Sequence, residues 1–115
     1  MKSSHDRSYP EHFRALDPER FWRYQSRWVC NTPASFTAAA RMMLAVDLTP
    51  EYAKIKAPTL VIAGRFDPAT TVEAGEYLKA NIPGAKLAIV DAAHIANVEA
   101  PDAYTKTVLD FLASR

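Results

Sequence analysis

The sequence predicts an α/β fold in which two parallel strands with flanking helices follow a helical segment. The apolar run "TLVIAG" is rich in β-branched residues and ends in glycine, and "KLAIVD" repeats this pattern after a turn at "IPGA". Such runs are typical of strands buried on both faces in a parallel sheet. Between them, "TTVEAGEYLKANI" carries apolar residues at helical spacing. A strand, a helix and a strand in this order form a right-handed parallel unit.

The segment of residues 13–57 is expected to be helical. It contains no glycine, and its aromatic and aliphatic residues recur every three or four positions. "LDPERFWRY" places Asp17 as a cap before Pro18, and "CNTPAS" supplies capping groups before Pro33. We therefore expect a helix in two pieces before "CNTPAS" and a second helix after it. Residues 1–12 are expected to form a loose segment.

Residues 58–115 are expected to hold the two strands and two helices. Thr70 or Thr71 is the expected cap of the crossover helix. The chain closes with "APDAYTKTVLDFLASR", an amphipathic pattern that Pro101 opens. This last helix should cover one face of the sheet with its apolar side, which carries Tyr104, Val108, Leu109, Phe111 and Leu112.

Composition excludes several classes of function. The chain has 115 residues, 14 basic against 13 acidic, and a net charge of +1. The basic residues are spread among acidic ones and form no stripe, so nucleic acid is not an expected partner. The apolar runs fall far short of the ~20 residues of a spanning helix, and no apolar stretch follows the first charges as in a secretory signal. We expect a cytoplasmic chain that does not enter a membrane.

No metal or cofactor is expected. Cys30 is the one cysteine of the sequence, which excludes an internal disulfide and a cysteine metal cluster. A buried apolar thiol is the expectation for it. His5 and His12 have no carboxylate at ligand spacing in the sequence, so they do not indicate a metal site.

Asp67 and His94 are the candidate catalytic residues. Asp67 follows the first expected strand through "GRFD", and His94 follows the second through "DAAH". Functional residues of open α/β sheets collect at the carboxyl ends of parallel strands, so the two side chains should meet there. A carboxylate bonded to one imidazole nitrogen orients the ring as a general base. Separately, an aspartate before proline is often only a turn residue, and a loop histidine is often inert.

Two further polar residues follow His94 in "HIANVEAP". Asn97 and Glu99 could orient the loop of His94 or cap the last helix. Capping is the favoured interpretation.

The motifs "IKAPTLVIAGRFDPATT", "AAHIANVEAP" and "FTAAARMMLAVDL" resemble the C-terminal part of an α/β-hydrolase. Within that superfamily they are most similar to 3-oxoadipate enol-lactonase, a hydrolase of aromatic catabolism in the β-ketoadipate pathway. The resemblance runs from about Phe13 to Leu112. It implies a small-molecule ester or lactone substrate, with Asp67 as the triad acid and His94 as the general base.

The resemblance also implies that the helical segment before Pro58 is the end of a cap over the active site. Candidates for lining that site are Trp22, Arg27, Trp28 and Phe36. Aromatic residues at helical spacing are more often core residues than substrate contacts.

The sequence departs from this superfamily in one respect, because it holds no G-x-S-x-G motif. That motif carries the nucleophilic serine on a strained turn between a strand and a helix. The glycines are Gly64, Gly75 and Gly84, and no serine lies between two of them at that spacing. We therefore expect the nucleophile and the oxyanion-hole donors to lie outside this chain.

Three interpretations of function remain open. In the first, the chain is the C-terminal part of a hydrolase and needs a complementary N-terminal half that supplies the serine. In the second, it folds alone or as a homo-oligomer and is a binding or structural module with a remnant acid–base pair. Pairing with another copy is reasonable there, because two strands alone leave exposed sheet edges. In the third, Cys30 is a nucleophile served by His94, although no activating neighbour of this cysteine is visible.

Overall fold

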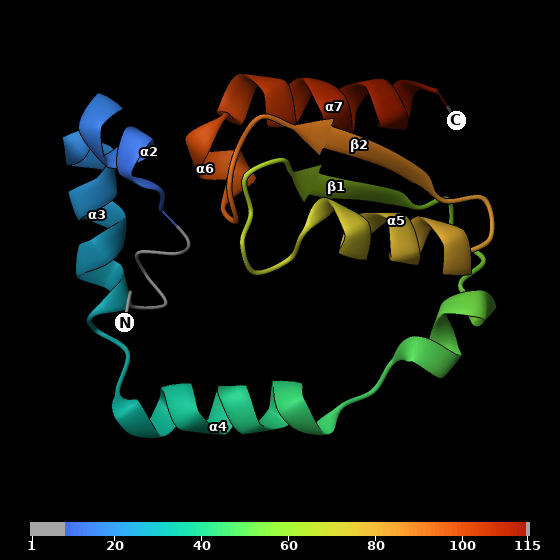
Figure 1. Cartoon of the computed structure of the whole chain (residues 1–115), viewed down its shortest axis with the longest axis horizontal. Coiled ribbons are helices and arrows are strands. Elements are labelled where there is room, and N and C mark those ends of the chain that lie inside the picture. Colours follow the sequence, from blue (N-terminus) through green and yellow to red (C-terminus); the bar gives the residue numbers. More distant parts are fainter. Residues whose placement is uncertain (1–8, 115) are drawn as a thin grey trace.

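The computed structural model describes residues 9–114 and confirms the α/β fold class (Figure 1). Of the expected loose segment of residues 1–12, residues 1–8 lie outside the described residues. The expectation does not hold for residues 9–12, because Tyr9 is buried and a helix begins at Glu11. The elements are, in chain order, helices α2 (Glu11–Leu16), α3 (Pro18–Trp28) and α4 (Pro33–Ala45), the 3₁₀ helix η1 (Thr49–Lys54), strand β1 (Leu60–Gly64), helix α5 (Val72–Asn81), strand β2 (Lys86–Val90), and helices α6 (Ala96–Glu99) and α7 (Pro101–Ala113).

The helix boundaries of the first half follow from local capping. The side chain of Asp17 accepts a hydrogen bond from the backbone N–H of Arg20, and Pro18 opens α3. The side chain of Thr32 accepts from the backbone N–H of Ser35 in the same way at the start of α4. The expected division of this half into three helical pieces is therefore confirmed, and its cause is side-chain capping of otherwise unsatisfied N–H groups.

The strands pair in parallel, with Leu60 opposite Lys86 and Gly64 opposite Val90. Helix α5 makes the crossover, and α5 and α7 lie on opposite sides of the strands (Figure 1). Gly75 of α5 lets that helix approach one face closely, because a Cβ there would lie 3.2 Å from the Cβ of Ala63. Tyr104 of α7 packs on the opposite face, against a core cluster of Val90, Ala92 and Ala96.

A second core cluster lies between the first helices and α6. It consists of Tyr9, Phe13, Phe21 and Val98, with Tyr24 and Ile95 packed against it. The ring of Tyr9 stacks on that of Phe13 and meets Phe21 edge-on. Although α6 was not expected from the sequence, it is the element through which the first helices reach the loop after β2.

Burial of the sheet is less complete than the sequence predicts. Only Ala63 and Gly64 of β1 are buried, and Leu60 to Ile62 are half-buried. Helix α7 covers its face with half-buried Tyr104 and Phe111, whereas Leu109 and Leu112 are exposed. The expectation of a strand buried on both faces was wrong for the first part of β1, because β1 pairs with one strand only among the described residues.

Helix α4 has no buried residue and lies apart from the sheet (Figure 1). Its exposed apolar side chains include Phe36, Met42, Met43 and Leu44. The Cα radius of gyration is 15.9 Å, whereas a compact domain of this length is expected near ~13 Å. The chain is therefore extended and leaves apolar surface uncovered. None of the described helices combines the length and apolarity needed to cross a membrane.

Candidate active site

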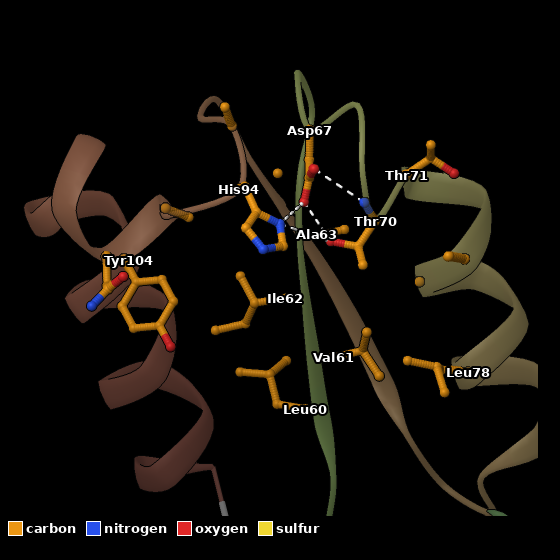
Figure 2. A pocket seen from close by; sticks show the side chains of 16 residues that line it. Leu60, Val61, Ile62, Ala63, Asp67, Thr70, Thr71, Leu78, His94 and Tyr104 are labelled. Carbon is orange, nitrogen blue, oxygen red and sulfur yellow. Dashed lines mark hydrogen bonds and ion pairs between the residues drawn. The ribbon is translucent and has the colours of Figure 1, made fainter. Parts of the chain in front are cut away.

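Asp67 and His94 meet at the carboxyl ends of β1 and β2 (Figure 2). The Nδ1 atom of His94 lies 2.8 Å from Oδ2 of Asp67. Backbone bonds fix both loops, because Arg65 N–H donates to Val90 O and Phe66 N–H donates to Ala92 O. The structure thus brings together the two residues that the sequence singled out.

Gly64 permits the two loops to cross at close range. A Cβ at this position would lie 2.4 Å from the carbonyl oxygen of Ala93 and 2.6 Å from that of Ala92. Real Cβ atoms essentially never approach backbone oxygens so closely. Any side chain at position 64 would therefore push the segment before His94 away from Asp67.

Asp67 is a buried carboxylate held by several donors. Its side chain is 4% exposed. Oδ1 accepts from the backbone N–H groups of Ala69 (2.7 Å) and Thr70 (3.0 Å), and Oδ2 accepts from the Thr70 hydroxyl. Burial acts to raise the pKa of Asp67, but hydrogen bonds from Thr70, His94 and the backbone outweigh it and hold the pKa below its ordinary value. Asp67 is therefore both a turn residue and the partner of His94.

The bond to Asp67 sets the tautomer of His94. An ionised carboxylate only accepts hydrogen bonds, so Nδ1 carries the proton that it shares with Asp67. In the neutral ring Nε2 then holds a lone pair, and this atom faces the cavity in Figure 2. The side chain of His94 is 38% exposed, which leaves Nε2 accessible. The arrangement is that of a base and its orienting acid.

Thr70 is a site residue that sequence reasoning missed. It was expected only as a possible helix cap, but the N-cap of α5 is Thr71. Besides its bond to Asp67, the Thr70 hydroxyl lies 3.3 Å from Nδ1 of His94. The available signal was its position shortly after an aspartate at a strand end, because an aspartate in a turn often bonds groups that follow it closely in the sequence.

Glu99 orients the loop of His94, and the expectation that Asn97 and Glu99 cap the last helix was wrong. Helix α7 has Ala100 as its N-cap and no side-chain cap bond. Oε2 of Glu99 instead accepts from the backbone N–H of Ala93, at 2.7 Å. Asn97 is exposed and lines the cavity at His94.

His12 has a carboxylate partner that its sequence neighbourhood did not show. Its Nε2 lies 2.5 Å from Oε1 of Glu99, 87 positions away along the chain. Only the fold brings these two side chains together. Within residues 9–114 no group of three His, Cys, Asp or Glu side chains gathers as a metal site would require.

A cavity of about 390 Å³ opens beside the pair. Its polar end carries Asp67, Thr70 and His94, and β1 forms an apolar wall along its length (Figure 2). Leu78 of α5 and Tyr104 of α7 lie on either side of that wall. The cavity therefore has an imidazole at one end and an apolar wall along its length, a combination common in sites for small organic molecules.

The other expected site residues lie elsewhere. Trp22 is 61% exposed on α3 and meets Phe21 edge-on, and Phe36 is 49% exposed on α4. Arg27 is exposed on α3, and the side chain of Trp28 is outside the described part of the chain. Trp22, Arg27 and Phe36 do not line the cavity at His94. Their assignment as substrate contacts remains a proposal.

Cys30 is exposed, so the expectation of a buried thiol was wrong. Its Sγ donates to the carbonyl oxygen of Ser26, one helical turn earlier. The residue follows α3 and does not line the cavity at His94. The helix end to which it belongs is solvent-exposed, which explains the exposed thiol.

The sequence is similar to curated enol-lactonases. No family model matches the sequence. The chain is 33% identical over 87 residues to 3-oxoadipate enol-lactonase 1 of Acinetobacter baylyi, covering 75% of this chain and 33% of that protein. It is 37% identical over 73 residues to 3-oxoadipate enol-lactonase 2 of the same organism, covering 64% of this chain and 27% of that protein.

A solved structure of an enol-lactonase is also similar to this chain. The enol-lactonase from Burkholderia xenovorans LB400 superimposes with a TM-score of 0.90 and 35% identity, over 94% of this chain and 42% of that chain. The present chain therefore spans about a third of the length of the first curated relative and less than half of the solved structure.

Proposed function

Because this chain has the fold of the C-terminal part of an α/β-hydrolase, we propose that it supplies the acid and histidine of a hydrolase site for a carboxylic ester or lactone. The observation that carries the proposal is the 2.8 Å contact between Asp67 and His94 at the ends of two parallel strands. A buried, ionised aspartate and an accessible Nε2 are the two features that a general base in acyl transfer needs.

The chemistry follows from this geometry. A serine hydroxyl attacks the substrate carbonyl while Nε2 of His94 takes its proton, and Asp67 stabilises the imidazolium that forms. His94 then returns the proton to the leaving oxygen as the carbon–oxygen bond breaks. In a lactone the leaving oxygen stays attached to the acyl group. Water, deprotonated by His94, next attacks the acyl-serine. As the acyl–serine bond breaks, His94 returns this proton to the serine oxygen, which releases the acid and regenerates the serine hydroxyl.

We propose that the serine and the oxyanion-hole donors come from a complementary N-terminal hydrolase half. One edge of β1 supports this, because no strand among the described residues pairs with it. Lys86 N–H donates to Thr59 O and Arg65 N–H donates to Val90 O. Backbone polar groups alternate between the two edges of a strand, so those of Leu60 and Ile62 point away from β2. An unpaired edge beside an apolar trough favours a further strand there.

Helix α4 supports the same partner. Its exposed Phe36, Met43 and Leu44 would cost free energy in water and would be covered in a larger assembly. In this proposal residues 13–57 are part of a cap over the site, and residues 58–115 are part of the hydrolase core.

For the substrate, we propose 3-oxoadipate enol-lactone, which would place the activity in the β-ketoadipate pathway of aromatic catabolism. The names of the two Acinetobacter relatives and of the Burkholderia structure support this choice. A small lactone is also compatible with a cavity of about 390 Å³.

A self-associating fragment without activity is the second candidate. Two features of the described residues favour it, namely the unpaired edge of β1 and the exposed apolar side chains of α4. A second copy of the chain would pair with that edge and cover those side chains. Asp67 and His94 would then be a remnant of a hydrolase site.

Hydrolysis of p-nitrophenyl acetate by the purified chain tests whether the nucleophile comes from a separate partner. We expect no rate above that of buffer, and the same result for His94→Ala, because no serine stands at a nucleophile elbow in this sequence. Activity abolished by His94→Ala would overturn the need for an external nucleophile. The mass measured by size-exclusion chromatography with light scattering distinguishes a monomer from the self-associating alternative.

A further inference from the structure

We propose that Glu99 and His12 are positioning residues that hold the loop of His94 in register with the loop of Asp67. This inference rests on the proposed role of His94 as the general base. Neither residue contacts a reacting atom in it; both act through the segment that carries His94.

Glu99 anchors the residue before His94. Its side chain is 7% exposed. Oε2 accepts from the backbone N–H of Ala93, itself 1% exposed, and Oε1 binds His12. Ala93 is also the residue whose carbonyl oxygen lies against Gly64. The peptide before His94 is therefore fixed on both sides, by a carboxylate on one and by the end of β1 on the other.

His12 links the two catalytic loops. Its Nε2 is 2.5 Å from Glu99, and its ring meets that of Phe66 edge-on, with 6.3 Å between centroids. Phe66 directly precedes Asp67 in the sequence. The His12 ring thus contacts Phe66, next to Asp67. It also contacts Glu99, which binds the residue before His94.

Helices α2 and α3 also pack against the segment that bears Glu99. Phe13, next to His12, is 4% exposed and packs in the cluster that includes Val98. Arg20 of α3 donates to the carbonyl oxygen of Val98, at 3.1 Å. The α6 segment that bears Glu99 is therefore attached to α2 and α3 by a buried cluster and a hydrogen bond.

The consequence is geometric. The contact between Asp67 and His94 joins two loops, and small displacements in catalytic geometry cost large factors in rate. Loss of the Glu99 side chain leaves the buried N–H of Ala93 without its hydrogen-bond acceptor and removes the carboxylate partner of His12. The loop of His94 then gains freedom, and the imidazole spends less time on Asp67.

Nuclear magnetic resonance of the full 115-residue chain tests this inference without any substrate. The two readouts are the exchange rate of the Ala93 amide hydrogen and the resonance of the His94 Nδ1 proton, which is seen only while it is held by Asp67. In Glu99→Ala we expect amide exchange faster by about tenfold or more and a broadened or absent Nδ1 resonance. Glu51→Ala, which breaks an exposed ion pair with Lys54, is the matched control and should change neither.

Two conservative variants guard against a general loss of folding. The amide of Glu99→Gln can still accept from Ala93 and donate to His12, so wild-type readouts are expected. Glu99→Asp keeps the charge but is one methylene shorter and cannot reach both partners, so faster Ala93 exchange is expected. Wild-type exchange and a wild-type Nδ1 resonance in Glu99→Asp and in His12→Ala would overturn the inference. Because these readouts need no nucleophile or substrate, a failure of this inference can be told apart from a failure of the proposed hydrolase activity.

Discussion

Nδ1 of His94 lies 2.8 Å from Oδ2 of Asp67, and this single contact joins the ends of two neighbouring parallel strands. The aspartate is buried and receives bonds from the backbone and from Thr70, whereas the histidine is partly exposed to the cavity. In the proposed function, this difference in burial suits the two side chains to different roles. A buried carboxylate orients and stabilises, and an accessible imidazole exchanges protons.

Asp67→Asn should change how stability depends on pH. The pKa of Asp67 is lowered in the folded chain, so its ionised form stabilises the fold above the ordinary pKa of about 4. That stabilisation is lost as the pH falls through the lowered folded pKa. We expect Asp67→Asn to lower the free energy of unfolding by about 1 to 2 kcal/mol at pH 7 and by less at low pH.

Urea unfolding curves of the wild type and Asp67→Asn at neutral and acidic pH measure this difference. Equal destabilisation at both pH values would show that the charge of Asp67 contributes nothing to the fold.

Thr70→Val should raise the pKa of Asp67 towards its ordinary value. Valine has the shape of threonine but removes the hydroxyl that donates to Oδ2. Thr70→Ser retains that donor and is the control. Titration of the Asp67 carboxyl carbon by nuclear magnetic resonance measures both variants, and an unchanged pKa in Thr70→Val would argue against a role for Thr70 at the site.

Gly64→Ala should disrupt the site more than Gly84→Ala. A Cβ at position 64 meets two backbone oxygens, which forces the loop of His94 to move and costs about 1 to 3 kcal/mol as overpacking does. Gly84 has a positive φ of 72° but open space around it, so its cost is backbone strain of about 1 to 2 kcal/mol.

The two glycine variants differ most in what happens to His94. We expect the Nδ1 resonance of His94 to shift or vanish in Gly64→Ala and to persist in Gly84→Ala. The opposite pattern would contradict the close crossing of the two loops.

Cys30 should behave as an ordinary exposed thiol. Its exposure after α3, away from the cavity, predicts that it reacts with a disulfide reagent in the native chain without prior unfolding. His94→Ala should leave the rate of this reaction unchanged. A rate that depends on His94 would revive the interpretation of Cys30 as the nucleophile.

Much of the fold could be predicted because its signals are local. Asp17 before Pro18 and Thr32 before Pro33 cap helices through neighbours three residues away. The apolar runs around Ile62 and Ile89 predict strands in the same way. Asp67 and His94 were predictable as a pair because parallel strands bring their carboxyl ends to one edge.

The remaining features depend on tertiary contacts that no local pattern reveals. Glu99 lies 87 positions from His12, so its role in the site is set by how α2 packs beside α6. The exposure of Cys30 and the half-burial of β1 likewise depend on what covers each element. A sequence pattern can show that a surface is apolar, but not whether this chain provides its cover.

The most direct test of the proposed function is a chimeric enzyme. This chain would replace the matching segment of 3-oxoadipate enol-lactonase 1 of Acinetobacter baylyi, and the rest of that enzyme would be retained in the same polypeptide. We expect the chimera to hydrolyse 3-oxoadipate enol-lactone and to lose about 10³-fold or more in kcat with His94→Ala. A folded chimera that is inactive, or whose activity does not depend on His94, would contradict the assignment of Asp67 and His94 as the acid and base of a hydrolase.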